Sequence, residues 1–197
     1  MKQLVLASGN AGKLKELSAL LAPLGIEVLP QSAFQVPEAE EPHPSFIENA
    51  IAKARHAAHV TGLPALADDS GLCVHILGGS PGVLSARFAG EPKSDQRNNE
   101  LLLTRLAGQT DRRARFYCAL ALVRHADDPQ PLMATGEWHG EILDAPRGSA
   151  GFGYDPLFLV PDLEQTAAEI PAELKNVLSH RGKAFRQLLD KLQAELA

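Results

Sequence analysis

The chain has 197 residues, of which 45% are hydrophobic and 22% are charged. These proportions are typical of a soluble globular protein, and the length suffices for one domain with a substantial core. The formal net charge of −5 excludes a general nucleic-acid or membrane-binding surface, because such partners require a basic footprint. We therefore expect a single domain over residues 1–197, with no nucleic-acid partner and no membrane association.

Two cysteines, Cys73 and Cys118, each lie in an apolar run. This usage favours two reduced, packed thiols in a cytosolic protein over a disulfide framework. The N-terminus has no basic region followed by a long apolar stretch, and no window reaches the roughly 18 apolar residues of a membrane span. These features predict a cytoplasmic location.

The first residues predict a strand, a glycine-rich turn and a helix. The apolar run at 4–7 is followed by the turn Ser8–Lys13 and then by leucines at helical spacing. The first N–H groups of a helix lack intrahelical partners and the helix dipole is positive there, so this turn suits a phosphate, to which Lys13 adds a charge. The glycines could equally serve only the strand–helix connection. The spacing excludes a Walker loop, because two residues separate Gly9 from Gly12 and a leucine follows the lysine.

A second strand is predicted over 26–29, after Gly25 ends the first helix. The polar segment 31–44 has no periodicity and contains three glutamates, which form either a solvated acidic loop or part of a metal site. Ser45 and Glu48 then form a capping-box pattern that begins a helix with an apolar stripe, and this helix carries Lys53. Lys53 is either a solvated lysine or a second ammonium group beside a phosphate.

Adjacent carboxylates at Asp68 and Asp69 stand between two apolar segments, 63–67 and 72–77, that read as separate strands. Either the two carboxylates cap a turn through side-chain hydrogen bonds, or they hold a divalent cation or activate water. Oxygen ligands favour Mg²⁺ or Mn²⁺ over zinc. Neighbouring ionised carboxylates repel each other, so a cation between them and a phosphate is the physically consistent arrangement.

The middle of the chain predicts a mixed sheet. Ser94 caps a helix that ends before Gly108, and the segments 114–125 and 132–142 form a long antiparallel hairpin across an aspartate-rich turn. The overall pattern is an α/β fold. The seven histidines lack the spacing of a zinc site.

A glycine-rich loop at 146–156 carries Phe152, Tyr154 and Asp155. A flat ring could lie between the two aromatic rings while Asp155 bonds to its edge, although ordinary core aromatics are the competing interpretation. A strand is predicted at 157–160. Helices are predicted at 167–178 and 185–196.

Five motifs together resemble the inosine/xanthosine triphosphate pyrophosphatases, which hydrolyse non-standard purine nucleoside triphosphates. The motifs are Ser8-Gly9-Asn10-x-x-Lys13, Phe46-x-Glu48-Asn49-Ala50-x-x-Lys53-Ala54, Asp68-Asp69-Ser70-Gly71-Leu72, Phe152-Gly153-Tyr154-Asp155-Pro156 and Lys175-x-x-x-Ser179-His180-Arg181. The resemblance implies a homodimer of elongated, two-lobed α/β subunits. Each subunit would have a mixed sheet flanked by helices and a Mg²⁺-dependent cleft between its lobes.

The resemblance also implies a role for each matching residue. Asp69 is the general base and a magnesium ligand, and Glu41 is the second metal carboxylate, although the family's usual Glu-Glu-Thr-Gly reads Glu-Glu-Pro-His in this chain. The remaining residues contact the substrate: the triphosphate is bound by Ser8, Gly9, Asn10, Ala11, Gly12, Lys13 and Lys53, with Asp68 and Ser70 beside Asp69, and the nucleobase by Phe152, Gly153, Tyr154, Asp155, Lys175, His180 and Arg181.

These roles predict hydrolysis of dITP, ITP, XTP and dXTP to the monophosphate and pyrophosphate, which cleanses the nucleotide pool. Lys175 and Arg181 can only donate hydrogen bonds, so they match a 6-oxo purine and not the 6-amino group of adenine. Two alternatives remain open. One is a Maf-like pyrophosphatase acting on other nucleotides, and the other is a nucleotide-binding sensor without catalysis.

Overall fold

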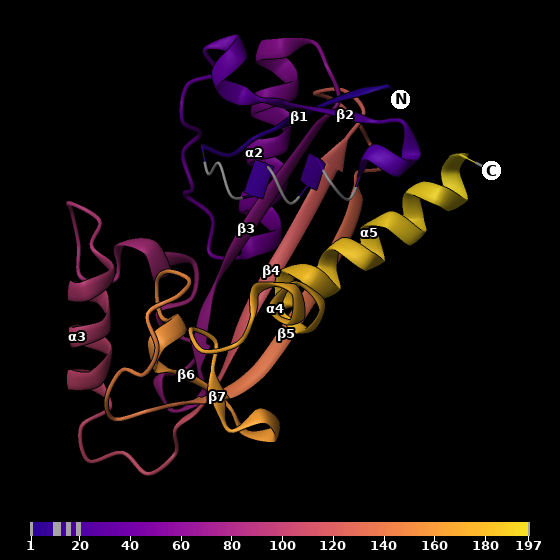
Figure 1. Ribbon diagram of the computed structural model, residues 1–197. Coiled ribbons are helices and arrows are strands. Elements are labelled where there is room, and N and C mark those ends of the chain that lie inside the picture. Colours follow the sequence, from indigo (N-terminus) through magenta and orange to yellow (C-terminus); the bar gives the residue numbers. More distant parts are fainter. Residues whose placement is uncertain (1, 10–12, 15–16, 19–20, 197) are drawn as a thin grey trace. The chain divides into compact units, whose positions relative to one another are not determined.

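The structure is a computed structural model that describes residues 2–9, 13–14, 17–18 and 21–196 (Figure 1). Its strands are β1 (Gln3–Leu6), β2 (Glu27–Pro30), β3 (Ala65–Val74), β4 (Arg113–Val123), β5 (Leu132–Ile142), β6 (Phe158–Val160) and β7 (Gln165–Thr166). The α-helices with both ends described are α2 (Phe46–Thr61), α3 (Asp95–Arg105), α4 (Ala172–Leu178) and α5 (His180–Leu196). Residues 13–14, 17–18 and 21 are also helical.

The described strands form one sheet in the order β2-β1-β3-β4-β5-β6-β7. Strand β1 runs parallel to β2 and β3, whereas β6 runs antiparallel to β5 and β7. This arrangement confirms the predicted mixed sheet with flanking helices. The chain divides into two compact units: unit 1 comprises Met1–Asp69, Ala119–Thr135 and Ala184–Ala197, and unit 2 comprises Ser70–Cys118 and Gly136–Lys183.

Helix α2 is positioned in unit 1 by an alanine face. Ala50, Ala54, Ala57 and Ala58 are buried, and their small side chains let the helix approach β1 closely. The predicted cap is present, because the Oγ of Ser45 accepts a hydrogen bond from the backbone N–H of Glu48 at 3.3 Å. The helix therefore begins where the capping box predicts.

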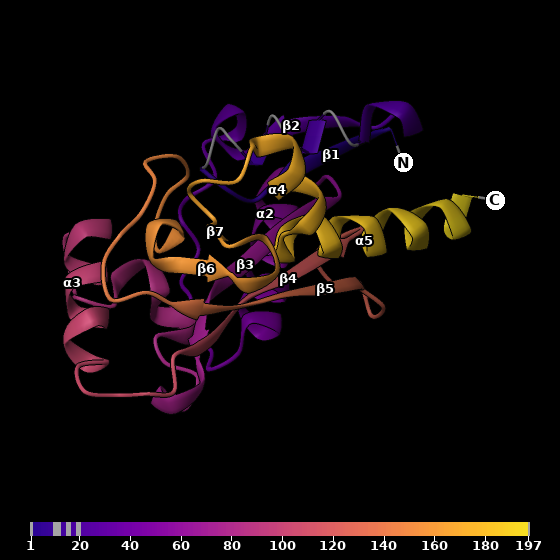
Figure 2. The same ribbon diagram turned by 60° about the horizontal axis from the view of Figure 1, so that its bottom comes forward.

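Helix α5 lies alongside β5 within unit 1 (Figure 2). The Oε1 of Gln187 accepts from the backbone N–H of Thr135 at 2.8 Å, and the Nζ of Lys191 donates to the carbonyl of Met133 at 2.6 Å. These bonds pair backbone groups of β5 with side chains of the helix. They fix the C-terminal helix along the strand.

Unit 2 has its own hydrophobic core. Gly140 marks a close approach in this core, since a Cβ there would lie 2.3 Å from the carbonyl oxygen of Leu159 on the paired strand β6. The core members are Leu72, Val74, Leu102, Leu106, Ala114, Phe116, Trp138, Ile142, Tyr154, Leu157, Phe158, Val160, Ala167 and Ile170.

The two carboxylates at 68 and 69 do not lie in a turn between strands. They lie within the single ten-residue strand β3, which runs from Ala65 to Val74. Of the two alternatives, the turn with side-chain caps is wrong, because both aspartates gain lysine partners that let polar residues remain within a strand.

The C-terminal helices also begin at other residues than predicted. Residues 167–171 are not helical, and α4 starts after Pro171, whose fixed φ and missing N–H suit it to a helix start and not an interior. Helix α5 starts at His180, before the predicted residue 185, and the Oγ of Ser179 accepts the backbone N–H of Gly182 at 3.2 Å. His180 and Arg181 therefore lie in the first turn of a helix.

Cys118 is buried and Cys73 is partly buried, and neither forms a disulfide among the described residues. Within the part of the chain that the structure describes, no helix combines the length and the apolar character needed to cross a bilayer.

Candidate functional site

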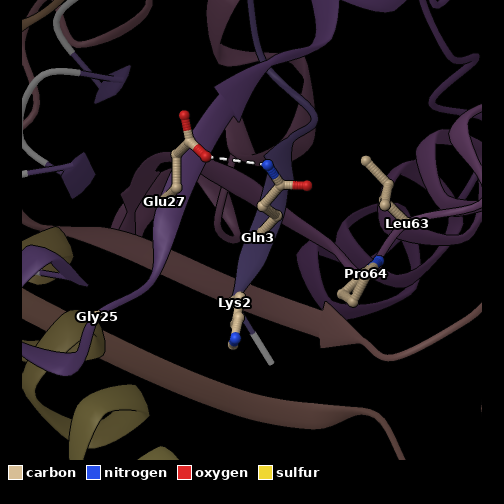
Figure 3. A pocket seen from close by; sticks show the side chains of 6 residues that line it. All are labelled: Lys2, Gln3, Gly25, Glu27, Leu63 and Pro64. Atoms are coloured by element: carbon tan, nitrogen blue, oxygen red, sulfur yellow. Dashed lines mark hydrogen bonds between the residues drawn. The ribbon is translucent and has the colours of Figure 1, made fainter.

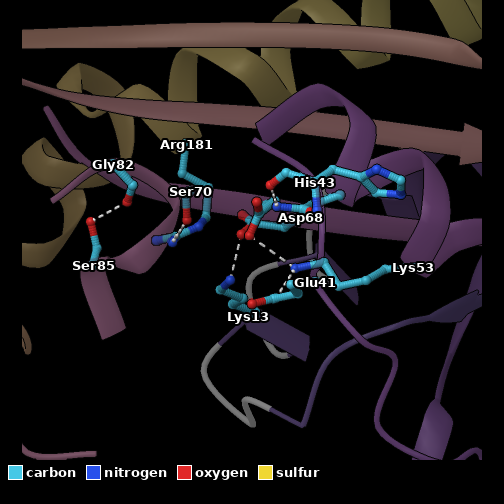
Figure 4. Close-up of polar contacts among 11 residues, drawn as sticks. Lys13, Glu41, His43, Lys53, Asp68, Ser70, Gly82, Ser85 and Arg181 are labelled. Atoms are coloured by element: carbon cyan, nitrogen blue, oxygen red, sulfur yellow. Dashed lines mark hydrogen bonds and ion pairs between the residues drawn. The ribbon is translucent and has the colours of Figure 1, made fainter. Parts of the chain in front are cut away.

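Two lysine–carboxylate pairs lie at β3 in unit 1 (Figure 4). Their aspartates follow Leu66, the last residue of β3 that pairs with β1. The Nζ of Lys13 lies 2.5 Å from the Oδ1 of Asp68, and the Nζ of Lys53 lies 3.0 Å from the Oδ1 of Asp69. Successive side chains of a strand point to opposite faces, so neighbouring aspartates reach different lysines. Each carboxylate is thus compensated by its own ammonium group.

Glu41 joins the second pair and makes it a triad. The Nζ of Lys53 donates to the Oε1 of Glu41 at 2.8 Å as well as to Asp69. Burial works to lower the pKa of Lys53, but the two carboxylates outweigh it and raise the pKa. Burial raises the pKa of Asp69, because one ammonium group shared with Glu41 does not offset its desolvation. The triad therefore places two carboxylates around one ammonium group.

The acidic loop is held in place by Asn49, a fully buried residue of α2. Its Oδ1 accepts from the backbone N–H of His43 at 3.0 Å, and its Nδ2 donates to the carbonyl of His43 at 3.1 Å. This two-point attachment fixes the backbone two residues after Glu41. It explains how the Glu41 carboxylate reaches Lys53 although Pro42 replaces the family's usual threonine.

The triad fits a magnesium ion. The Oδ2 of Asp69 is buried and has no hydrogen-bond partner among the described residues, and Glu41 supplies a second carboxylate across the same lysine. No group of three or more His, Cys, Asp or Glu side chains that could hold a metal exists in the described ranges. Mg²⁺ is commonly held by one or two carboxylates, with water and substrate phosphates as the other ligands, so this donor set is adequate.

Part of the predicted phosphate turn lies outside the described residues, namely Asn10, Ala11 and Gly12. Ser8 and Gly9 follow β1 after Ala7, and the backbone N–H of Ser8 donates to the carbonyl of Leu6 at 2.9 Å. A Cβ built on Gly9 meets no atom within 4 Å. These two residues and Lys13 are located at the carboxyl end of β1, where ligands bind to parallel sheets.

In unit 2, the glycine-rich loop presents Phe152 beside two cations. The ring is 57% exposed, and both the Nζ of Lys175 and the Cζ of Arg181 lie 6.0 Å from its centroid. The Oδ2 of Asp155 accepts from the backbone N–H of Phe152 at 2.9 Å and from Lys175 at 2.6 Å. Asp155 thereby fixes both the aromatic residue and one of its cationic neighbours.

Gly151 is required beside this ion pair. Its φ is +79°, and a Cβ there would lie 2.1 Å from the Oδ2 of Asp155 and 3.0 Å from the Nζ of Lys175. Any side chain at this position would be strained and would displace the carboxylate.

Tyr154 does not form the second wall of an aromatic slot. Its side chain is buried in the core of unit 2, and its hydroxyl donates to the carbonyl of Ser85 at 2.8 Å. Burial and the nearby carboxylate of Asp95 raise the pKa of Tyr154. The expectation that a flat ring lies between Phe152 and Tyr154 is therefore wrong, because only Phe152 presents an accessible ring face.

His180 and Arg181 project from the start of α5. The ring of His180 stacks on Phe116, with centroids 4.9 Å apart and an interplanar angle of 15°. The Nη2 of Arg181 donates to the Oγ of Ser70 at 3.2 Å. Ser70 belongs to unit 2, so this bond ties the start of α5 to strand β3 within that unit.

Three residues that support the site were given no role from the sequence, although Asn49 is part of a family motif. Asn49 is detectable as a polar residue inside the apolar stripe of α2. Asp95 and Asn99 of α3 carry no such signal, yet the Oδ2 of Asp95 accepts the backbone N–H of Gly153 at 2.7 Å and the Nδ2 of Asn99 donates to its carbonyl at 2.9 Å. Their role depends on a tertiary contact that local spacing does not encode.

A surface hollow in unit 1 lacks comparable chemistry (Figure 3). It lies at the amino ends of the parallel strands, opposite the lysine–carboxylate pairs. Its main polar contact joins the Nε2 of Gln3 to the Oε2 of Glu27 at 2.9 Å. The hollow is lined by Lys2, Gln3, Gly25, Glu27, Leu63 and Pro64.

The chain is similar to known proteins over nearly its full length. The sequence model of the Ham1 family matches residues 4–191. A dITP/XTP pyrophosphatase of Aromatoleum aromaticum is 73% identical over 190 residues, with 96% of each chain covered, and one of Ralstonia nicotianae is 60% identical with 98% of each covered.

The solved structure of a HAM1 protein from Coxiella burnetii has a TM-score of 0.95 and 49% identity, covering 98% of this chain and 100% of its own. The Staphylococcus aureus Ham1 protein has a TM-score of 0.91 and 40% identity, with the same coverage. Family model, sequence relatives and folds thus converge over nearly the full length: the chain belongs to the Ham1 family.

Proposed function

We propose that the chain hydrolyses non-standard purine nucleoside triphosphates, namely ITP, dITP, XTP and dXTP, to the monophosphate and pyrophosphate. The single observation that carries the proposal is the triad Glu41–Lys53–Asp69, in which a buried carboxylate with an unpartnered oxygen lies beside an ammonium group. The curated names of the relatives support the same reaction and the same substrates.

The triphosphate is bound by Lys13, Lys53 and the turn at the end of β1. In the absence of substrate, each ammonium group is paired with an aspartate. A bound polyphosphate would compete with these aspartates for the two lysines. The backbone N–H groups that follow the turn add donors for phosphate oxygens. These contacts offset the negative charge that builds on the leaving pyrophosphate.

Asp69 acts as the general base. Its raised pKa brings the carboxylate closer to the pKa that suits proton transfer near neutral pH, and its buried Oδ2 is available to accept a proton from water. The water oxygen forms a bond to the α-phosphorus as the bond to the bridging oxygen breaks, and pyrophosphate leaves. Mg²⁺ held by Glu41 and Asp69 would supply charge neutralisation at the phosphates.

The nucleobase is recognised in unit 2. Phe152 offers an exposed ring face for stacking, and Lys175 and Arg181 flank it as hydrogen-bond donors. A 6-oxo purine accepts such bonds, whereas the 6-amino group of adenine leaves a donor unpaired at a cost of about 1–3 kcal/mol. His180, Gly153 and Asp155 complete the surroundings of the base. The enzyme works as a cytoplasmic homodimer that requires Mg²⁺.

A substrate panel tests this function against its rivals. Pyrophosphate release is measured with ITP, dITP, XTP and ATP, each with and without added Mg²⁺. We expect release from the three non-standard purines, weak release from ATP and loss of activity without the metal. A preference for pyrimidine or modified nucleotides added to the panel would favour a Maf-like enzyme, and binding without release would favour a sensor.

A further inference from the structure

The backbone around Phe152 is held by side chains from a helix that carries none of the expected site residues. Gly153 has a left-handed φ of +61° and directly follows the exposed aromatic residue. Its N–H donates to the Oδ2 of Asp95 at 2.7 Å, and its carbonyl accepts from the Nδ2 of Asn99 at 2.9 Å. Both polar groups of one residue are thus bound by α3.

Asp95 and Asn99 are four residues apart, so they project from one face of the helix. Ser94 caps α3 by accepting the backbone N–H of Arg97 at 3.3 Å, which sets the first turn that carries Asp95. The face that contacts Gly153 is therefore defined by the start of the helix.

The helix is itself anchored to the segment that holds Tyr154. The Nδ2 of Asn98, which is 2% exposed, donates to the carbonyls of Ser85 and Ala86 at 3.3 and 3.0 Å. The same carbonyl of Ser85 accepts the hydroxyl of Tyr154. Tyr154, which follows Gly153, and Asn98, which precedes Asn99, therefore share one acceptor. This shared contact restricts movement of the loop against α3.

We propose that Asp95 and Asn99 are positioning residues for nucleobase selection, acting through Gly153 on the ring of Phe152. This inference rests on the proposed function. A stacking surface needs an exposed ring on a fixed backbone, and the loop provides both, because the ring is 57% exposed while its flanking peptide groups are bound by side chains.

A purely structural anchor would account less well for Asn99. Its Oδ1 is buried and lacks a partner in the described part of the chain, a cost that a residue selected only for stability would avoid. The contact that Asn99 does make is directed at the peptide next to Phe152. This geometry is consistent with selection for loop position.

The test is a double-mutant cycle between Asp95 and Phe152. Michaelis constants and turnover numbers for ITP and ATP are measured for the wild type, Asp95→Ala, Phe152→Ala and the double variant. We expect Asp95→Ala to raise the KM for ITP about 5-fold, within the range that one stacked base contributes, with kcat changed less than about 2-fold. In the Phe152→Ala background the same substitution should leave the KM for ITP and the ITP-to-ATP preference unchanged.

Two further variants sharpen the result. Asp95→Asn keeps a carbonyl acceptor for the N–H of Gly153 and should restore most of the ITP affinity, and Asn99→Ala should behave as Asp95→Ala does. Gln96→Ala is the matched control, since it removes only an exposed bond of 2.9 Å to Glu100 on the same helix. It should leave all constants at wild-type values.

The inference would be overturned if Asp95→Ala raised the KM for ITP equally with and without the Phe152 ring. Wild-type kinetic constants in the Asp95→Ala variant would overturn it as well. A thermal unfolding curve for each variant identifies loss of folding, in which case Asp95→Asn carries the comparison. Failure of the wild type to release pyrophosphate from ITP would instead refute the proposed function, so the two failures are distinguishable.

Discussion

Substitution of Asp69 by asparagine separates proton transfer from binding. Asparagine keeps the size of the side chain, and its Oδ1 can still accept from Lys53, which lies 3.0 Å from the carboxylate oxygen. The second oxygen becomes an NH₂ group that can neither take a proton nor bind a metal ion. Loss of a general base typically costs about 10²- to 10⁴-fold in rate, or about 3–5 kcal/mol of transition-state stabilisation.

The fold should tolerate this change. Burial raises the pKa of Asp69, so ionisation of this carboxylate is less favourable in the folded chain than in the unfolded chain. Stability linked to such a group is present below its ordinary pKa and is lost as the pH rises through the folded value. The amide of the Asp69→Asn variant does not titrate, so we expect its melting temperature at pH 8 to be equal to or above that of the wild type.

The assay is steady-state pyrophosphate release from ITP at saturating Mg²⁺, together with ITP binding by calorimetry. The exposed turn residue Asp127 supplies the matched control, because Asp127→Asn changes the same charge in unit 1 away from both lysines. We expect wild-type turnover in the control and a kcat at least about 100-fold lower in Asp69→Asn. Near-normal turnover in Asp69→Asn, with ITP still bound, would refute the assignment of Asp69 as the base.

Three further predictions address binding, specificity and stability. Lys53→Met should raise the KM for ITP at least about 10-fold in the same assay, since it removes the ammonium group between two carboxylates; an unchanged KM would contradict its role in phosphate binding. Arg181→Ala should reduce the ITP-to-ATP ratio of kcat/KM by about 10-fold, corresponding to the cost of one unpaired donor, and an unchanged ratio would place base recognition elsewhere.

Asp128→Ala should lower the free energy of unfolding by about 2 kcal/mol at pH 7, because the buried carboxylate accepts the backbone N–H groups of Arg124 and Gln130, each at 2.9 Å. Burial would raise the pKa of Asp128, but these bonds outweigh it and lower the pKa, so the stabilisation is present above the ordinary value near 4 and fades as the pH falls below it. Urea titrations at pH 7 and pH 3.5 should show the difference shrinking; a constant difference would argue against the carboxylate.

Local sequence signals predicted the parts of the fold that depend on neighbours in the chain. The capping box at Ser45 and the alanine stripe predicted α2, and Gly25, with a left-handed φ of +68°, ends the preceding turn as expected. Only the family resemblance assigned Lys13 and Lys53 to one phosphate site, because local spacing left the role of each lysine open. The hairpin β4–β5 followed from two long apolar segments and an aspartate-rich turn.

The errors have a common physical cause. Adjacent aspartates suggest a turn, because buried carboxylates within a strand are costly without oppositely charged partners. In this chain the partners are lysines that are distant in the sequence, so local spacing does not reveal them. Tyr154 was placed beside the base because spacing does not reveal which aromatic side chain finds a buried acceptor such as the carbonyl of Ser85. Contacts between distant segments, not local propensity, decide these positions.

The position of bond cleavage is the most direct test of the central claim, that water primed by Asp69 attacks the α-phosphorus. Hydrolysis of ITP in ¹⁸O-labelled water, followed by mass spectrometry of both products, locates the new bond. We expect one label in inosine monophosphate and none in pyrophosphate. Label in pyrophosphate, or release of labelled orthophosphate, would contradict it.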